Sequence, residues 1–109
     1  MIIDFKDIEE TVFKNFRGGE KETSVRMFND NINRIMQGKL EPGASIGLHT
    51  HEENSEIIYI IKGCGKILYD NQYANIKAGI CHYCPKGHAH SLINDSTDDL
   101  IFFAVVPKQ

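Results

Sequence analysis

Residues 43–63 read GASIGLHTHEENSEIIYIIKG, and this stretch decides how the rest of the chain is interpreted. His49 and His51 are two positions apart in a predicted strand, so both imidazoles leave the same face of the sheet. Glu56 opens the next predicted strand after a short polar break. Two histidines and a carboxylate brought together in this way can bind one metal ion.

The strand that begins at Glu56 is apolar on both of its faces. Ile58 and Ile60 share the parity of Glu56. The opposite face carries three large apolar residues, Ile57, Tyr59 and Ile61. Apolar residues on both faces indicate that both are covered, and another subunit would cover the outer one. This predicts a homodimer with an isologous interface.

A second stretch, residues 79–94, reads GICHYCPKGHAHSLIN, with a turn at Pro85 and Gly87 and a strand beginning at His90. Together the two stretches resemble the two sequence motifs of the cupin superfamily. The matching positions are Gly43, His49, His51, Glu56, Gly63, Gly79, Pro85, Gly87, His90 and Asn94. Ile80 departs from the pattern, because many cupins have an acid there, but that position is not a metal ligand in the family.

The resemblance implies an all-β fold, the cupin-type double-stranded β-helix or jelly-roll barrel, and a mononuclear metal site. The implied ligands are His49, His51, Glu56 and His90. Three neutral imidazoles and one carboxylate suit one divalent transition metal ion per chain: Fe, Mn, Ni, Co or Zn. An octahedral ion held in this way keeps two positions open, and its net positive charge favours an anionic oxygen.

The pattern beyond the motifs also favours an all-β fold. Short apolar runs alternate with turn clusters, and the predicted strands cover residues 25–28, 34–40, 45–51, 56–62, 66–69, 73–77, 80–84, 90–94 and 100–106. With no helix of ordinary length, this indicates a sandwich or barrel. We assign residues 23–109 to the cupin barrel domain.

Residues 1–22 are predicted to form an N-terminal arm of strand and loop, associated with the dimer. Residues 2–5 predict a short edge strand, because three of the four are large and apolar. Residues 7–16 place apolar side chains at roughly helical spacing, and two glycines then interrupt the chain. This second segment is predicted to be a loop or one weak helical turn.

The three cysteines are predicted to be reduced thiols, because their number is odd and the chain has no export signal. Cys81 and Cys84 have the spacing of a redox or zinc motif. They lie in a predicted strand, however, where residues three apart point to opposite faces and the thiols diverge. A zinc site would also need a second pair. We interpret both as small, partly buried strand residues.

His82, His88 and Tyr83 are weak candidates for a catalytic role. An imidazole beside the metal could titrate near neutral pH and act as a base, or hold a ligand in place. The favoured interpretation is simpler: the histidines are polar residues at strand ends, and the tyrosine packs with a solvated hydroxyl.

Composition excludes several classes of partner. The formal net charge is −3, and no cluster of basic residues predicts a nucleic-acid site. Apolar runs such as residues 57–61 are too short to span a bilayer. The first seven residues include acids where a signal peptide needs a long apolar segment, so a cytoplasmic location is predicted.

Three functional hypotheses follow. The first, placed slightly ahead, is metal-dependent chemistry of a dioxygenase, isomerase, lyase or decarboxylase type on a small oxygenated or carboxylated metabolite. The second is non-catalytic binding or sensing of a sugar or organic acid. The third, a structural or storage role, is disfavoured by the small size and the intact ligand set.

Overall fold

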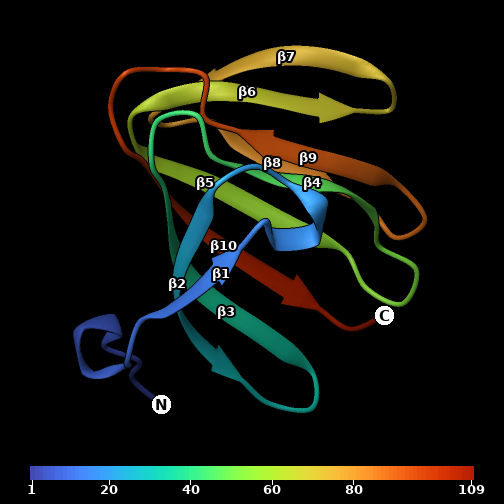
Figure 1. Ribbon diagram of the computed structural model, residues 1–109. Coiled ribbons are helices and arrows are strands. Elements are labelled where there is room, and N and C mark those ends of the chain that lie inside the picture. The colour runs from blue at the N-terminus through green and yellow to red at the C-terminus, as the bar shows by residue number, and fades with distance from the viewer.

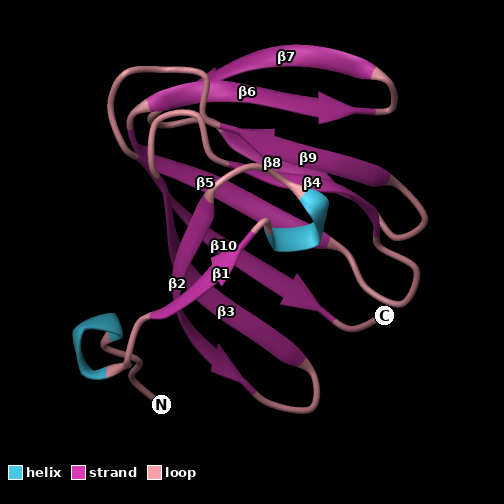
Figure 2. Ribbon diagram, viewed as in Figure 1, coloured by secondary structure: helices cyan, strands magenta, loops and turns pink.

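Ten antiparallel strands form two sheets in the computed structural model, which describes all 109 residues (Figures 1 and 2). The larger sheet has the order β1-β2-β3-β10-β5-β8, and the smaller sheet has the order β4-β9-β6-β7. The strands are β1 Thr11–Lys14, β2 Glu22–Asn29, β3 Asn33–Leu40, β4 Ser45–Thr50, β5 Glu56–Lys62, β6 Cys64–Tyr69, β7 Gln72–Lys77, β8 Cys81–Cys84, β9 Ala89–Ile93 and β10 Leu100–Pro107. The predicted all-β fold is confirmed.

Strand β10 lies between β3 and β5 in the larger sheet. Its alternate residues are buried, namely Leu100, Phe102, Ala104 and Val106. Phe102 requires the glycine opposite it on β3, because a Cβ at Gly38 would lie 2.3 Å from Cζ of the ring. Burial of a phenylalanine side chain stabilises a fold by about 1.5–3 kcal/mol.

Strand β5 follows the predicted alternation. Ile58 and Ile60 are each 1% exposed and belong to the core. On the other face Ile57, Tyr59 and Ile61 are 38%, 45% and 44% exposed. The larger sheet therefore has an inner face that packs in the core and, along β5, an apolar outer face open to solvent.

The hairpin predicted over residues 66–77 is formed by β6 and β7. Asp70 and Asn71 occupy its turn with φ values of 49° and 65°. Positive φ at both central residues is typical of a two-residue hairpin turn, and asparagine and aspartate tolerate it better than most residues.

Two residues of the sequence motifs hold the loop at residues 94–99. Gly63 has a φ of +90°, and a Cβ there would lie 2.4 Å from the carbonyl oxygen of Asp99, so glycine alone fits. Asn94 is fully buried. Its side-chain amide donates to two backbone carbonyls, and its Oδ1 accepts from the backbone N–H of Ser96. The connection from β9 to β10 is thereby fixed.

The N-terminal segment differs from the prediction. The strand predicted over residues 2–5 is wrong: residues Phe5–Asp7 form a short 3₁₀ turn, η1, in which the Asp4 side chain accepts from the N–H of Lys6. The first strand is β1, at residues predicted to be loop or helical turn. β1 forms because it pairs with β2, a contact that local spacing does not reveal.

No helix in the structure is both long enough and apolar enough to cross a membrane. The only helical segments are η1 and a second short 3₁₀ turn, η2, at Phe16–Gly18.

Candidate metal centre

A bulge in β4 sets the direction of the first two histidines. The pairing of β4 with β9 changes register between Ile46 and His49, with one extra residue on β4. Ile46 and His49 are three positions apart and would face opposite sides of a regular strand. The extra residue lets both side chains face inward, while the side chain of Leu48 is 56% exposed. His51 follows two positions later and is buried. The shared face predicted for His49 and His51 is confirmed.

The turn η2 docks against this bulge through direct backbone contact. A Cβ at Gly47 would lie 2.0 Å from the carbonyl oxygen of Arg17. A Cβ at Gly19 would lie 2.0 Å from the carbonyl oxygen of Ser45. Glycine at both positions therefore lets η2 approach β4, and the docking brings Arg17 into the wall of the cavity beside the histidines.

Backbone hydrogen bonds join the two motif stretches. The N–H of His51 donates to the carbonyl of His88 at 3.0 Å, and the N–H of Gly87 donates to the carbonyl of His51 at 2.6 Å. Within the β4–β9 pair, next to these hydrogen bonds, His49 lies directly opposite His90. Glu56 enters from the start of β5 in the larger sheet. Both sheets thus contribute to one cluster.

Four donor atoms converge in this cluster, the Nε2 atoms of His49, His51 and His90 and Oε1 of Glu56. Oε1 lies 2.9 Å from Nε2 of His90, 3.1 Å from that of His51 and 3.9 Å from that of His49. The Nε2 atoms of His51 and His90 are 2.9 Å apart. One donor atom from each of the four residues lies within 4.8 Å of the others.

The outward-facing nitrogens of the three rings have partners of their own. Nδ1 of His49 lies 2.7 Å from the carbonyl oxygen of Gly47, and Nδ1 of His51 contacts Oδ1 of Asn54. Both oxygens only accept, so each Nδ1 carries the proton and each Nε2 presents a lone pair. Nδ1 of His90 lies 2.9 Å from Nε2 of His82, which can accept in the same way.

This donor set fits a divalent transition metal ion. When the three rings are neutral, their Nε2 lone pairs and a carboxylate oxygen face one another, and a cation between them stabilises this arrangement. Bonds of about 2.1 Å at right angles would separate neighbouring donors by about 3.0 Å. The shortest separations in the cluster, 2.9 to 3.1 Å, agree with that value. The identity of the metal is not specified by these donors.

Titration of the metal-free cluster is strongly perturbed. Burial alone would raise the pKa of Glu56, but hydrogen bonds from His51 and His90 outweigh it and lower the pKa to about 2. Burial lowers the pKa of His49 to about 4. Burial also opposes a charge on His51, but hydrogen bonds to Glu56 and Asn54 raise its pKa on balance. The carboxylate is therefore ionised, and a metal ion would compete with protons for the His51 ring.

The three weak catalytic candidates lie in different places. His82 faces inward from β8 and contacts His90, so it is not merely a polar strand end. His88 lies at the end of the turn before β9, where its Nδ1 faces the carboxylate of Asp70 at 3.1 Å and the hydroxyl of Tyr69 at 3.2 Å. Tyr83 is 53% exposed on the outer face of β8, and the structure does not bring it to the cluster.

The two cysteines of β8 diverge, as strand geometry predicted. Cys81 is exposed, which corrects the expectation that it is partly buried, and Cys84 is fully buried. Cys84 could form a second metal-binding group with His82 and His90. Burial raises the pKa of the Cys84 thiol to about 11, so the thiolate that binds a metal forms less readily there. The cluster around Glu56 is the better candidate.

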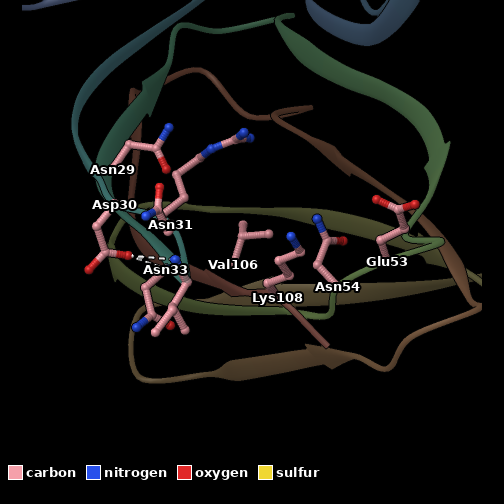
Figure 3. A pocket seen from close by; sticks show the side chains of 10 residues that line it. Asn29, Asp30, Asn31, Asn33, Glu53, Asn54, Val106 and Lys108 are labelled. Carbon is pink, nitrogen blue, oxygen red and sulfur yellow. Dashed lines mark hydrogen bonds between the residues drawn. The ribbon is translucent and has the colours of Figure 1, made fainter.

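Two adjacent hollows share part of their lining, and one of them reaches the cluster. The inner cavity, about 30 Å³, is lined by His49, His51 and Glu56, by apolar core residues, and by Arg17 and Arg34. The outer pocket, about 170 Å³, is polar, and its side chains come from the β2–β3 turn, the β4–β5 loop and the end of β10 (Figure 3). Arg34 and Val106 line both.

A family model described as the cupin domain matches residues 36–106. The chain is a cupin. Over 113 aligned residues it is 34% identical to the Oxalate-binding protein of Thermotoga maritima, across 97% of this chain and 93% of the relative. A crystal structure from Thermotoga maritima, described as a predicted oxalate decarboxylase, matches this cupin with a TM-score of 0.94 and 33% identity over 100% of both chains.

More distant cupins share the fold alone. A sugar phosphate isomerase from Silicibacter pomeroyi matches 100% of this chain and 76% of its own, with a TM-score of 0.81 and 21% identity. These matches confirm the predicted double-stranded β-helix. Sequence reasoning did not predict the contacts of His82 and Asn54 with the ligand rings, because neither residue belongs to the motif positions that were matched.

Proposed function

We propose that this cupin binds one divalent transition metal ion through His49, His51, Glu56 and His90, and that the ion binds oxalate or a similarly small carboxylic acid. The convergence of four lone-pair donors beside a small cavity carries the proposal. The relative from Thermotoga maritima named Oxalate-binding protein supports the choice of ligand.

The size of the inner cavity favours a very small ligand. A volume of about 30 Å³ corresponds to only a few water positions, since one water needs about 10–15 Å³ on this measure. A two-carbon acid that replaces the waters of the metal is consistent with such a space. A sugar, one of the ligands considered from the sequence, would need a larger opening.

The protein residues have separable tasks in this proposal. Asn54, the Gly47 carbonyl and His82 hold the three ligand rings with Nε2 inward. Apolar neighbours such as Ile46 and Phe102 limit the water in the cavity. The bound ion would supply a positive centre that attracts two carboxylate oxygens.

Calorimetric titration of oxalate tests the proposal. We expect oxalate to bind the Mn(II)-loaded protein with a stoichiometry of one per chain and not to bind metal-free protein. Acetate, which has one carboxylate, should bind the loaded protein more weakly. Equal heats from the loaded and metal-free forms would contradict metal-dependent binding.

Catalysis is the second candidate, and the crystal structure described as a predicted oxalate decarboxylase favours it. Decarboxylation of oxalate to formate and carbon dioxide consumes one proton, so a proton donor is needed near the ligand. Of the two candidate histidines, only His82 faces inward, His88 lies at the turn before β9, and neither lines the inner cavity. This arrangement favours binding over turnover. Formate produced in proportion to bound metal would reverse that order.

Assembly as a homodimer is also proposed, through the outer face of β5 and β8. The exposed residues Ile57, Tyr59, Ile61 and Tyr83 lie on this face. Light scattering at micromolar concentration should give the mass of two chains, and a Tyr59→Arg variant should give the mass of one. A mass of one chain for the parent protein would contradict the proposal. A role for residues 1–22 in the dimer, and the cytoplasmic location, stay predictions.

A further inference from the structure

The guanidinium of Arg34 has no partner within the protein. Its Nε is buried and makes no hydrogen bond. The ion pairs in the structure all involve histidines, and none includes Arg34. Buried polar groups in folded proteins nearly always have a hydrogen-bond partner, so the unpaired Nε–H of Arg34 is a donor available to a ligand.

Arg34 occupies a position that belongs to the core side of β3. The alternate residues Met36, Gly38 and Leu40 on the same face are buried, and Arg34 lies opposite Val106 of β10. The long side chain can pack its stem against apolar neighbours. Because Arg34 lines both hollows, it stands between the outer pocket and the metal ligands.

The acids near Arg34 are committed elsewhere or exposed. The carboxylate of Asp30, in the outer pocket, accepts from the backbone N–H groups of Ile32 and Asn33 at 2.8 and 2.7 Å, and so holds the β2–β3 turn (Figure 3). Glu53 is exposed. The Oε1 atom of Glu56 lies among the ligand histidines. No acid that lines the two hollows pairs with Arg34, so its guanidinium is free to bind an anion that enters the cavity.

Charge also favours an anion with two negative groups. Three neutral histidines, one carboxylate and a divalent ion have a net charge of +1, and Arg34 and Arg17, which both line the inner cavity, make the site more positive. A dicarboxylate, with two negative charges, suits such a site better than a monocarboxylate does. The planar guanidinium can also donate two parallel hydrogen bonds to one carboxylate, which a metal ion alone cannot.

We propose that Arg34 binds a carboxylate of the small anionic ligand held at the metal, and that it makes the site selective for dicarboxylates over monocarboxylates. This inference rests on the proposed metal-dependent binding of a small acid. It assigns the second anchor of the ligand to a residue outside both sequence motifs.

The test compares oxalate with acetate on four Mn(II)-loaded proteins: the parent, Arg34→Gln, Arg34→Lys and Lys108→Gln. Lys108 lines only the outer pocket, so its variant is a matched control for loss of one nearby positive charge. Metal content and thermal midpoint are measured first. Affinities then come from calorimetry.

We expect Arg34→Gln to keep one metal ion per chain and to bind oxalate about 10- to 100-fold more weakly, while its acetate affinity changes by less than about three-fold. The oxalate affinity of Arg34→Lys should lie between those of the parent and of Arg34→Gln, because an ammonium group keeps the charge but lacks the planar pair of donors. Lys108→Gln should match the parent protein.

Two results would overturn the inference and leave the proposed function standing: unchanged oxalate affinity in both Arg34 variants, or equal losses for oxalate and acetate in a folded, metal-loaded variant. If Arg34→Gln does not fold, unchanged selectivity in Arg34→Lys overturns it equally. A parent protein that binds neither metal nor oxalate would overturn the proposed function and the inference together.

Discussion

The two faces of β5 and β8 differ in nearly every property although they belong to the same strands. The inner face carries Glu56 and His82 beside the metal cluster, followed by buried isoleucines. The outer face carries exposed isoleucine and tyrosine side chains and makes no polar cluster. Strand alternation thus separates two proposed tasks, metal binding inside and a subunit contact outside.

Because the two faces differ in this way, one substitution on β5 or β8 should affect only one of the two tasks. A change on the inner face should alter metal binding or core stability and leave the mass of the assembly unchanged. A change on the outer face should do the reverse. The predictions below test that separation or the inner cluster itself, beginning with the largest expected effect.

Removal of a ligand should have the largest effect. His90→Ala removes one of the four candidate donor atoms. The His90 side chain is the most buried of the four, at 2% exposed. We expect metal affinity to fall by more than about 100-fold, as measured by competition with a chelator of known affinity. Tyr83→Ala, on the outer face of β8, is the control. A Tyr83 variant that loses metal to the same degree would contradict the separation.

Core stability should follow the same alternation. Ile58→Ala removes a fully buried side chain and should lower the free energy of unfolding by about 2–5 kcal/mol in urea titration. Ile57→Ala, one residue away on the outer face, should cost about 1 kcal/mol or less at the same protein concentration. Equal losses would show that the outer face is packed as tightly as the inner one.

A smaller effect is expected from the residue behind the ligand. His82→Phe removes the acceptor for Nδ1 of His90 and keeps an aromatic ring in the same place. Metal affinity should fall by about 10-fold. Cys84→Ala should leave it unchanged, because the buried thiol is not a ligand. A large loss in the Cys84 variant would instead favour the group of His82, Cys84 and His90.

The mildest test uses pH on the metal-free protein. Burial lowers the pKa values of His49 and His82 to about 4 in the folded state, against 6.5 as the ordinary value. At pH values between 4 and 6.5 the unfolded chain binds protons at these two histidines and the folded chain does not. The stability that they contribute above pH 6.5 is therefore lost as the pH falls toward 4. The raised pKa of His51 acts in the opposite direction.

Urea midpoints at pH 7.5 and pH 5 measure this balance. We expect the midpoint to be lower at pH 5, because two strongly depressed histidines oppose one raised histidine. Glu56 contributes little to the difference, since its carboxylate stays ionised until the pH falls toward its pKa of about 2. A higher midpoint at pH 5 would contradict the assigned burial of the two imidazoles.

Much of the fold and of the candidate site could be predicted from the sequence, because the patterns that indicate them are local. The alternation of residues 56–61 predicted which isoleucines lie inside, and the spacing of His49 and His51 predicted a shared face. Neither depends on knowing which strands are neighbours. The resemblance of ten motif positions supplied the remaining ligand, His90.

The missed features depend on contacts between distant segments. Strand β1 forms by pairing with β2, and a weak local pattern pointed elsewhere. The contact of His82 with His90 and the inward direction of Arg34 require the register of β8 against β5 and of β3 against β10. The bulge at β4 is also invisible in spacing, because it depends on pairing with β9.

The most direct test of the proposed metal centre is an anomalous-difference map from crystals of the metal-loaded protein. We expect one peak per chain, about 2.1 Å from Nε2 of His49, His51 and His90 and from Oε1 of Glu56. A peak between His82, Cys84 and His90, or no peak in crystals grown with saturating metal, would contradict it.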